Sequence, residues 1–496
     1  MVIEQLELAF HPGSVAVVGA SSNPLSPGYR FALHLVNYGY RGRIYPVTLN
    51  CSQVLGLKAY PSLRDIPGSV DYVICCLPAA KVLDLLAESS EKGVKFIHLF
   101  TGRFGETGQE DAARLEMEVL RRARALGIRL IGPNCMGIYY PEEGMAFAYD
   151  LPTEPGKVGM ISQSGGAATE FIHYASLRGI RFSKVISYGN ALDLNEADFL
   201  EYLCHDPETE IIAGYVEGVR DGSRFLKVLR QAALVKPVII LKAGRGNAGA
   251  RAAASHTAAL AGSFKMWETA IGQAGAIQAR TLEDMMDLVV SFYFLPPILG
   301  TGVGIAGGGG GKSVLSADAW EEAGFTVSSL PPEIAERIQN ALPEMWWRWI
   351  GNPVDVSIFP EEAIIANLGG NILRMMAQNP HFDLLIGNIS VGGPVSETEL
   401  AAGVRRQVSD IIDIHKEAKP LAVVLNTGAL GLEESDKLRW KCLAEEKAKL
   451  LAAGIAVYST ADQAAGAIIR LVSYHRRREA ISRSLSAPEP RSSSRS

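Results

Sequence analysis

Apolar and polar residues alternate in blocks along this chain, and the blocks have the lengths of strands and helices. Short β-branched apolar runs end in glycine or proline turns, and longer stretches with an apolar residue every three or four positions follow them. The first pattern indicates a buried parallel strand and the second an amphipathic helix. Their alternation predicts an α/β fold with doubly wound parallel sheets.

The blocks fall into three groups, which we interpret as three α/β domains in series. They span residues 1–145, 150–297 and 300–478, and the prolines of FLPPILG mark the joint between the second and the third. The first group contains SVAVV, RIYPV and KFIHLF, the second KVGMIS and PVIIL, and the third VGIAG and LAVVL. Residues 479–496 are rich in serine, proline and arginine, which predicts a disordered tail.

Composition and charge narrow the class of protein. The 496 residues are 48% hydrophobic and carry a net charge of −5, so no basic field favours nucleic acid or a membrane surface. We find no apolar run as long as a membrane span and no signal-peptide pattern at the start. The cysteines show no CxxC spacing and no His/Cys cluster has metal-ligand spacing. We therefore expect a cytoplasmic protein without a metal site on this chain.

One histidine lies in a segment of small residues. Residues 242–262, KAGRGNAGARAAASHTAALAG, follow the apolar run PVIIL, and such a loop lets the backbone come close to a ligand. The neutral imidazole of His256 can act as a nucleophile near pH 7. The segment therefore indicates a catalytic histidine, and a solvated or helix-capping histidine is the alternative.

Two other strand ends carry candidate chemistry. Ser164, Gly165 and Gly166 of SQSGG stand at a predicted helix start, where free N–H groups and the helix dipole favour an anion. Simple capping by Ser164 is the alternative. Glu217 ends another apolar run, where a carboxylate can accept the N–H of an imidazole and leave its other nitrogen free to attack. A solvated turn acid is the alternative there.

Two further glycine turns match phosphate-binding patterns only in part. VVGASSNP, residues 17–24, lacks the full GxGxxG, so it favours a phosphate-bearing ligand at a helix start over a dinucleotide. AGGGGGKS has Ala306 where the pattern GxxxxGK[ST] requires glycine. We therefore interpret the second segment as a plain turn between a strand and a helix.

Together, these segments resemble the ADP-forming acyl-CoA synthetases, relatives of succinyl-CoA ligase. The resemblance runs from Phe10 to about Tyr474 and rests on VVGASSNP, VICCLPAAKV, GPNCMG, SQSGG, YVEGVRDGSRF, residues 242–262 and NPVD. It implies a Rossmann-like CoA-binding domain followed by two flavodoxin-like ligase domains. The implied reaction is acid + CoA + ATP ⇌ acyl-CoA + ADP + phosphate, through acyl phosphate and a phosphohistidine, with the acyl group left open.

The resemblance also implies roles for single residues. His256 matches the histidine that is transiently phosphorylated, Glu217 the acid that orients it, and Ser164, Gly165 and Gly166 the helix start that holds the phosphoryl group. The coenzyme A contacts and the loop toward the substrate fall on Gly19, Ala20, Ser21, Leu77, Pro78, Ala79 and Asn134.

The nucleotide half of the reaction requires a partner in this interpretation. Single-chain members of the family carry an ATP-grasp domain, and the residues after Tyr474 do not match one. The resemblance therefore implies an ATP-grasp β subunit that binds ATP, ADP and Mg²⁺, in an α2β2 or similar assembly. Coenzyme A, phosphate and a small carboxylic acid would bind to this chain.

Three positions depart from the family pattern. Ala258 replaces a usual glycine, VTLN at residues 47–50 replaces V-N-P, and Arg30 is the nearest cation to a usual lysine position. A methyl group at residue 258 would stiffen the histidine segment. Two alternatives stay open on this basis: a non-catalytic CoA-binding regulator of the same fold, and a nicotinamide-dependent oxidoreductase.

Overall fold

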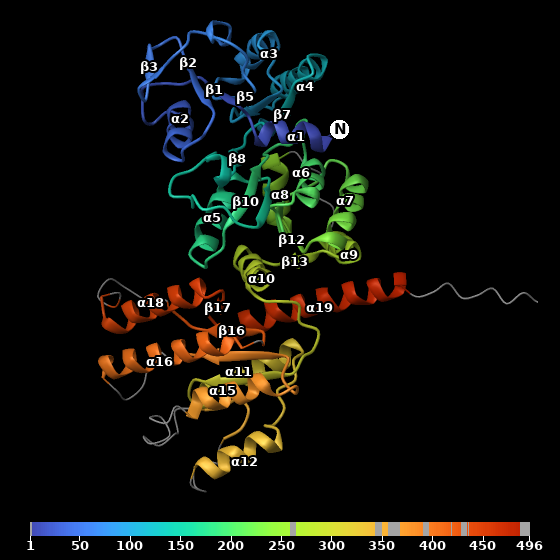
Figure 1. Ribbon diagram of the computed structural model, residues 1–496. Coiled ribbons are helices and arrows are strands. Elements are labelled where there is room, and N and C mark those ends of the chain that lie inside the picture. The colour runs from blue at the N-terminus through green and yellow to red at the C-terminus, as the bar shows by residue number, and fades with distance from the viewer. Residues whose placement is uncertain are drawn as a thin grey trace, which may run out of the picture. The chain divides into compact units, whose positions relative to one another are not determined.

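A computed structural model describes residues 2–257, 264–342, 350–355, 368–389, 396–417, 419–427, 434 and 436–486. The chain forms two compact units, residues 1–285 and 286–496 (Figure 1). Among the described residues, the first unit contains two large sheets and a two-stranded one, and the second unit contains one sheet of four strands. Within the described ranges, no helix combines the length and the apolar character that a membrane crossing requires.

The first sheet of unit 1 is parallel, with the strand order β2-β1-β5-β6-β7. Its strands are β1 Ser14–Val18, β2 Arg43–Val47, β5 Tyr72–Cys75, β6 Phe96–Leu99 and β7 Arg129–Ile131. The helices and turns around it are α2 Pro27–Asn37, α3 Val82–Glu91, α4 Glu110–Ala125, η1 Leu63–Asp65, η2 Ala79–Lys81 and η3 Gly105–Thr107, with a hairpin of β3 Gln53–Val54 and β4 Leu57–Lys58. Helix α1 Val2–Phe10 packs instead against a helix of the second sheet, α6 Glu196–His205. The order reverses between β1 and β5, which is where open α/β sheets bind ligands.

The second sheet has the order β13-β12-β11-β9-β10-β8, parallel except for β8. Its strands are β8 Gly137–Tyr139, β9 Val158–Ser162, β10 Phe182–Ser187, β11 Ile211–Val216, β12 Val238–Lys242 and β13 Ile277–Ala279. Its helices are α5 Gly165–Ser176, α6 Glu196–His205, α7 Gly222–Val235, α8 Asn247–Thr257 and α9 Phe264–Ala274, and η4 Pro141–Glu143 follows β8. Strand β8, which lies within the predicted first domain, pairs antiparallel with β10 of the second sheet.

The third sheet is parallel throughout its described strands. Its described strands follow one another as β14-β15-β16-β17, and the order reverses only through isolated bridges at Thr326 and Val354. The elements of this unit are β14 Val303–Gly307, β15 Leu384–Asn388, β16 Leu421–Val424, β17 Ala456–Tyr458, α11 Gly310–Ala323, α12 Pro332–Ala341, α15 Leu368–Gln378, α16 Glu397–His415, α18 Leu438–Ala452 and α19 Ala461–Ser486.

Helices α10 Leu282–Phe294 and α19 lie at the beginning and at the end of the described part of unit 2. Helix α10 belongs mostly to unit 2, because Ser291 Oγ lies 2.7 Å from the hydroxyl of Tyr458. Helix α19 continues to Ser486, past the predicted tail start at 479, and the guanidinium of Arg483 donates to Glu479 one turn earlier. Residues 487–496 lie outside the described residues.

The two sheets of unit 1 are joined by a buried carboxylate. Asp193 follows β10 and is 7% exposed. Its Oδ2 accepts hydrogen bonds from Arg129 Nε at 2.7 Å and from the Leu130 backbone N–H at 3.1 Å, both on β7. The start of β7 and the segment after β10 are therefore held together within this unit.

We expect acid to destabilise the first sheet through a buried histidine. His98 on β6 is 1% exposed, and burial lowers its pKa from 6.5 to about 4. The unfolded chain then binds more protons than the folded chain between these values, so stability falls as pH falls from 6.5 to 4. The loss approaches about 3 kcal/mol. Hydrogen exchange of the β6 amides against pH would measure it.

His34 on α2 contributes in the same direction, because burial lowers its pKa to about 4 as well. The variants His98→Leu and His34→Leu should each flatten the pH dependence. An unchanged slope in both variants would contradict the assignment.

Candidate functional site

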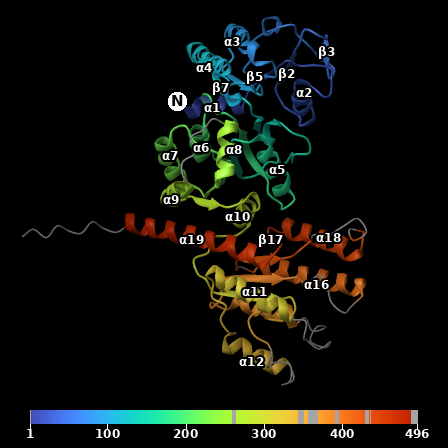
Figure 2. The same cartoon turned by 180° about the vertical axis from the view of Figure 1, so that it is seen from behind.

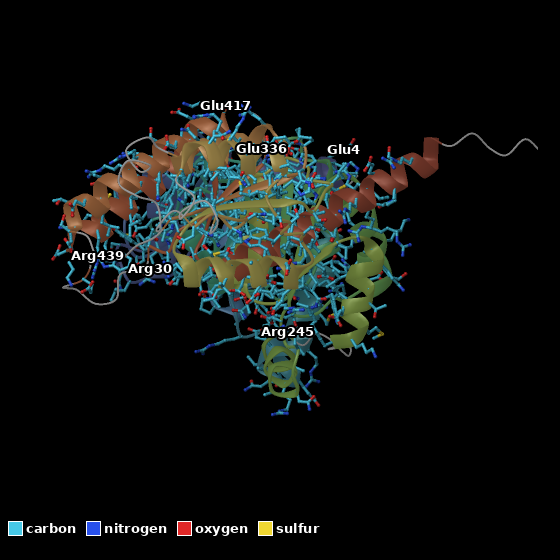
Figure 3. All side chains as sticks on the ribbon, turned by 90° about the horizontal axis from the view of Figure 1, so that it is seen from below. Glu4, Arg30, Arg245, Glu336, Glu417 and Arg439 are labelled. Carbon is cyan, nitrogen blue, oxygen red and sulfur yellow. The ribbon has the colours of Figure 1, made fainter. Side chains whose placement is uncertain are left out.

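The turn after β1 has the backbone geometry of a close-approach loop. Gly19 has φ +88°, and its N–H and that of Ala20 both donate to the carbonyl of Val47 at 3.1 Å. A Cβ on Gly28, in the first turn of α2, would lie 2.1 Å from the Gly19 carbonyl oxygen. The start of α2 is therefore packed directly on this turn. Arg30, the cation nearest to the usual lysine position, lies in α2 and is exposed (Figure 3).

The second predicted coenzyme A contact lies against the first. A Cβ on Gly19 would lie 3.3 Å from the backbone nitrogen of Leu77, since β1 and β5 are paired neighbours. Pro78 and Ala79 lead into η2. Ser21 completes the first turn, and its Oγ accepts the N–H of Asn23 at 3.0 Å. The structure thus brings together six of the seven residues predicted to contact coenzyme A or its substrate: Gly19, Ala20, Ser21, Leu77, Pro78 and Ala79.

Asn134, the seventh, lies in the loop after β7, two strands away from β5 at the same edge of the sheet, and has φ +57°. Its N–H donates to the carbonyl of Thr101 at 3.0 Å, and Thr101 Oγ1 donates to the carbonyl of Leu77 at 2.7 Å. Thr101 therefore links the two predicted loops. Sequence reasoning gave it no role, because a single threonine after a strand is not a distinctive signal.

The Asn134 loop reaches the second sheet at the start of α5. A Cβ on Gly165 would lie 2.4 Å from Met136 Cγ, and one on Gly189 would lie 2.5 Å from the carbonyl oxygen of Asn134. Met136 N–H also donates to Ser187 Oγ at 3.1 Å. The predicted substrate loop and the predicted phosphoryl-binding turn therefore lie side by side.

Ser164 caps α5, as the simpler interpretation predicts. Its Oγ accepts the N–H of Ala167 at 3.2 Å. Gly165 and Gly166 occupy the first turn, whose N–H groups have no acceptor inside the helix. Both glycines line a surface hollow, which Met136, Thr169, Glu170, His173, Tyr174 and Leu177 complete. The cap and an anion site are thus compatible, because they use different N–H groups.

Glu217 lies immediately after β11, next to this turn. It is 6% exposed, so it is not the solvated turn acid of the alternative interpretation. Gln163 Oε1 accepts the backbone N–H of Glu217 and, at 2.9 Å, that of Gly218. Strands β9 and β11 are direct neighbours, so the two predicted site segments share one sheet edge.

Two groups set the electrostatic environment of the Glu217 carboxylate. Tyr215 donates its hydroxyl to Glu217 Oε1 at 3.4 Å, and burial followed by the Glu217 charge raises the pKa of Tyr215 to about 12. Lys242 at the end of β12 is 2% exposed. Burial lowers the pKa of Lys242, and the charge of Glu217 opposes that shift. Sequence reasoning missed Gln163 and Lys242 as members of this site.

His256 lies in the last turn of α8, and its side chain falls outside the described residues, as does Ala258. The helix is reached from β12, the neighbour of β11. It lies against η3 of the first sheet and faces the viewer in Figure 2. Arg245, before the helix, is exposed, with its guanidinium 5.8 Å from the ring centroid of Phe264 (Figure 3). The helix carrying His256 thus belongs to the same unit as Glu217 and SQSGG.

Unit 2 contains the turn that resembles a phosphate loop. Gly307 has φ +99° and the cap of α11 at Gly309 makes no side-chain hydrogen bond. The segment is a turn between β14 and α11, as predicted. In the described part of the chain, no group of three or more His, Cys, Asp or Glu side chains is placed to hold a metal ion.

Comparisons with known proteins cover both units. A family model for a CoA binding domain matches residues 13–141, and one for a succinyl-CoA ligase like flavodoxin domain matches residues 155–292. The α subunit of the ADP-forming acetate–CoA ligase II of Pyrococcus furiosus is 37% identical over 85% of this chain and 90% of its own length. The ADP-forming acetate–CoA ligase of Methanocaldococcus jannaschii is 36% identical over 71% of this chain and 49% of its own length.

A solved structure is also similar to this chain. The dinucleotide-forming acetyl-coenzyme A synthetase 1 of Ca. Korarchaeum cryptofilum, in complex with phosphate and ADP, matches with a TM-score of 0.80 and 32% identity, over 97% of this chain and 99% of that one. The predicted fold class and family are therefore confirmed. This chain belongs to the ADP-forming acyl-CoA synthetases, acid–thiol ligases of the succinyl-CoA ligase superfamily.

Proposed function

We propose that this chain is the α subunit of such a synthetase and passes a phosphoryl group through His256. Coenzyme A binds at the turns of residues 19–21 and 77–79, and the acyl group lies toward Asn134. The start of α5 at residues 164–166 holds phosphate, and Glu217 orients the imidazole. The main support for this proposal is that the Asn134 loop, the start of α5 and the buried Glu217 lie close together in unit 1.

In the direction that consumes acyl-CoA, three chemical steps follow one another. A phosphate oxygen attacks the thioester carbonyl, the C–S bond breaks, and coenzyme A leaves as its thiol after taking up a proton. A ring nitrogen of His256 then attacks phosphorus of the acyl phosphate, and the P–O bond breaks to release the carboxylate. Phosphohistidine finally gives its phosphoryl group to ADP, which restores the free imidazole. A covalent intermediate divides one difficult transfer into easier ones.

The residues at this edge of the second sheet suit two parts of the chemistry, which are binding of the phosphoryl group and orientation of the imidazole. The free N–H groups of Gly165 and Gly166 and the positive end of the α5 dipole suit a phosphoryl group. The Glu217 carboxylate is buried, and an acid that accepts one ring N–H leaves the opposite nitrogen as the nucleophile. The donors are in place before the phosphoryl group arrives, so they need no reorganisation.

We further propose a separate ATP-grasp β subunit in an α2β2 assembly in the cytoplasm. That subunit would bind ATP or ADP with Mg²⁺, while a small carboxylic acid is the substrate here. Two observations support a partner: the Pyrococcus furiosus relatives are named as α subunits, and the chain spans about half the length of the Methanocaldococcus jannaschii enzyme.

Labelling with ATP would test the proposal. The chain, co-purified with its ATP-grasp partner, is incubated with γ-³²P-labelled ATP and separated by electrophoresis. We expect label on this chain that is stable in alkali, labile in acid, and removed by unlabelled ADP. An active complex that forms acyl-CoA without ever labelling this chain would overturn the proposal. A complex that binds coenzyme A but shows no activity would instead support the alternative function, a non-catalytic CoA-binding regulator.

A further inference from the structure

The side chain of Gln163 connects the phosphoryl-binding turn to the turn of Glu217. Gln163 lies between β9 and α5 and is 4% exposed. Its backbone N–H donates to the Tyr215 carbonyl at 3.1 Å. Its side-chain oxygen accepts the N–H groups of Glu217 and Gly218. One residue thus fixes the end of β11 at three points.

These contacts fix how the amide is oriented. Both groups that face Oε1 are backbone donors, and only the oxygen end of a carboxamide accepts hydrogen bonds. An apolar side chain of the same length would leave two buried N–H groups without a partner, which the chain would relieve by moving the turn. The turn carries Glu217, so such a movement displaces the carboxylate.

On this basis we infer that Gln163 is a positioning residue for phosphoryl transfer, which acts by holding the Glu217 turn. The inference rests on the proposed role of Glu217. The Gln163 side chain holds the backbone, and the carboxylate then orients the imidazole. Misplacement of a catalytic group by about 1 Å costs roughly 100-fold in rate, so a small backbone shift is sufficient for a large effect.

A double-mutant cycle tests this inference. The variants Gln163→Met, Glu217→Gln and the double variant are compared in the holoenzyme by the single-turnover rate at which this chain is labelled from acetyl-CoA and ³²P-labelled phosphate, because that label reaches His256 at the Glu217 site. We expect Gln163→Met to slow labelling about 10- to 100-fold and to leave coenzyme A affinity unchanged. If Gln163 acts through Glu217, the double variant should be no slower than Glu217→Gln alone.

Two further variants separate positioning from general destabilisation. Gln163→Asn withdraws the oxygen by one methylene and keeps the amide, so it serves if the methionine variant does not fold. Asn195→Ala removes the cap of α6 in the same domain, where Asn195 Oδ1 accepts the Ala197 N–H at 3.0 Å. Asn195→Ala should cause a small loss of labelling rate. In the double variant with Glu217→Gln the two losses should multiply, as expected for an independent structural effect.

The outcomes distinguish the inference from the function on which it rests. If Glu217→Gln labels as fast as the wild type, the proposed role of Glu217 is wrong. If Glu217→Gln is slow but the losses of Gln163→Met and Glu217→Gln multiply, the proposed function stands and the role of Gln163 is overturned. A Gln163→Met or Gln163→Asn enzyme that folds and labels at the wild-type rate would also overturn it.

Discussion

Replacing His256 by asparagine is expected to abolish the phosphoryl label on this chain. The proposed transfer needs a ring nitrogen that forms a bond to phosphorus, and an amide cannot supply it. Loss of a covalent nucleophile removes the pathway itself, so labelling and acyl-CoA formation should both fall below about one hundredth of the wild-type rates. The measurement is the ³²P label on the chain in the assembled enzyme, with folding checked by coenzyme A binding.

His173 is the matched control for this experiment. It lies on α5, lines the hollow at the proposed phosphate site, and its Nε2 is 3.0 Å from the Tyr149 carbonyl oxygen. A histidine so placed is the other candidate to accept a phosphoryl group near Gly165. His173→Asn should keep the label. Loss of label in His173→Asn, or its retention in His256→Asn, would assign the intermediate elsewhere.

The strands of unit 1 could be predicted because their signal is local. The runs VGMIS and VIILK are buried along their whole length in β9 and β12, and continuous apolar runs are what a parallel strand covered on both faces requires. The rule that parallel strands meet at their carboxyl ends then places Ser164 and Glu217 at one edge. The paired neighbours β9 and β11 confirm that placement.

Other features had no local signal. The Gln163 side chain reaches a turn 54 residues away, and hydrogen bonds of this kind leave no periodic pattern. Strand β8 was assigned to the first domain because the sequence shows no break before it, and only its antiparallel pairing with β10 places it in the second sheet. Helix α19 continues through Glu479–Ser486, where Glu479 and Arg483 form an ion pair one turn apart, and composition alone does not register such a pair.

Replacing Lys184 by methionine is expected to cost about 3–5 kcal/mol of unfolding free energy. Lys184 on β10 is 1% exposed, and its ammonium donates to both carboxylate oxygens of Asp206 at 3.0 and 3.1 Å and also to Glu208. It lies 4.4 Å from the ring centroid of Tyr140. Methionine preserves the apolar packing but leaves Asp206, whose side chain is 3% exposed, without its counter-charge.

Lys157→Met provides the comparison, because it breaks a solvent-facing ion pair of the same sheet, Lys157 with Glu210 at 3.0 Å. That variant should lose less than about 1 kcal/mol. Urea unfolding of both variants would measure the difference. Adding Asp206→Asn to Lys184→Met should recover part of the loss, because the cost arises from an isolated buried charge and not from lost contact area. Equal losses for Lys184→Met and Lys157→Met would contradict this account.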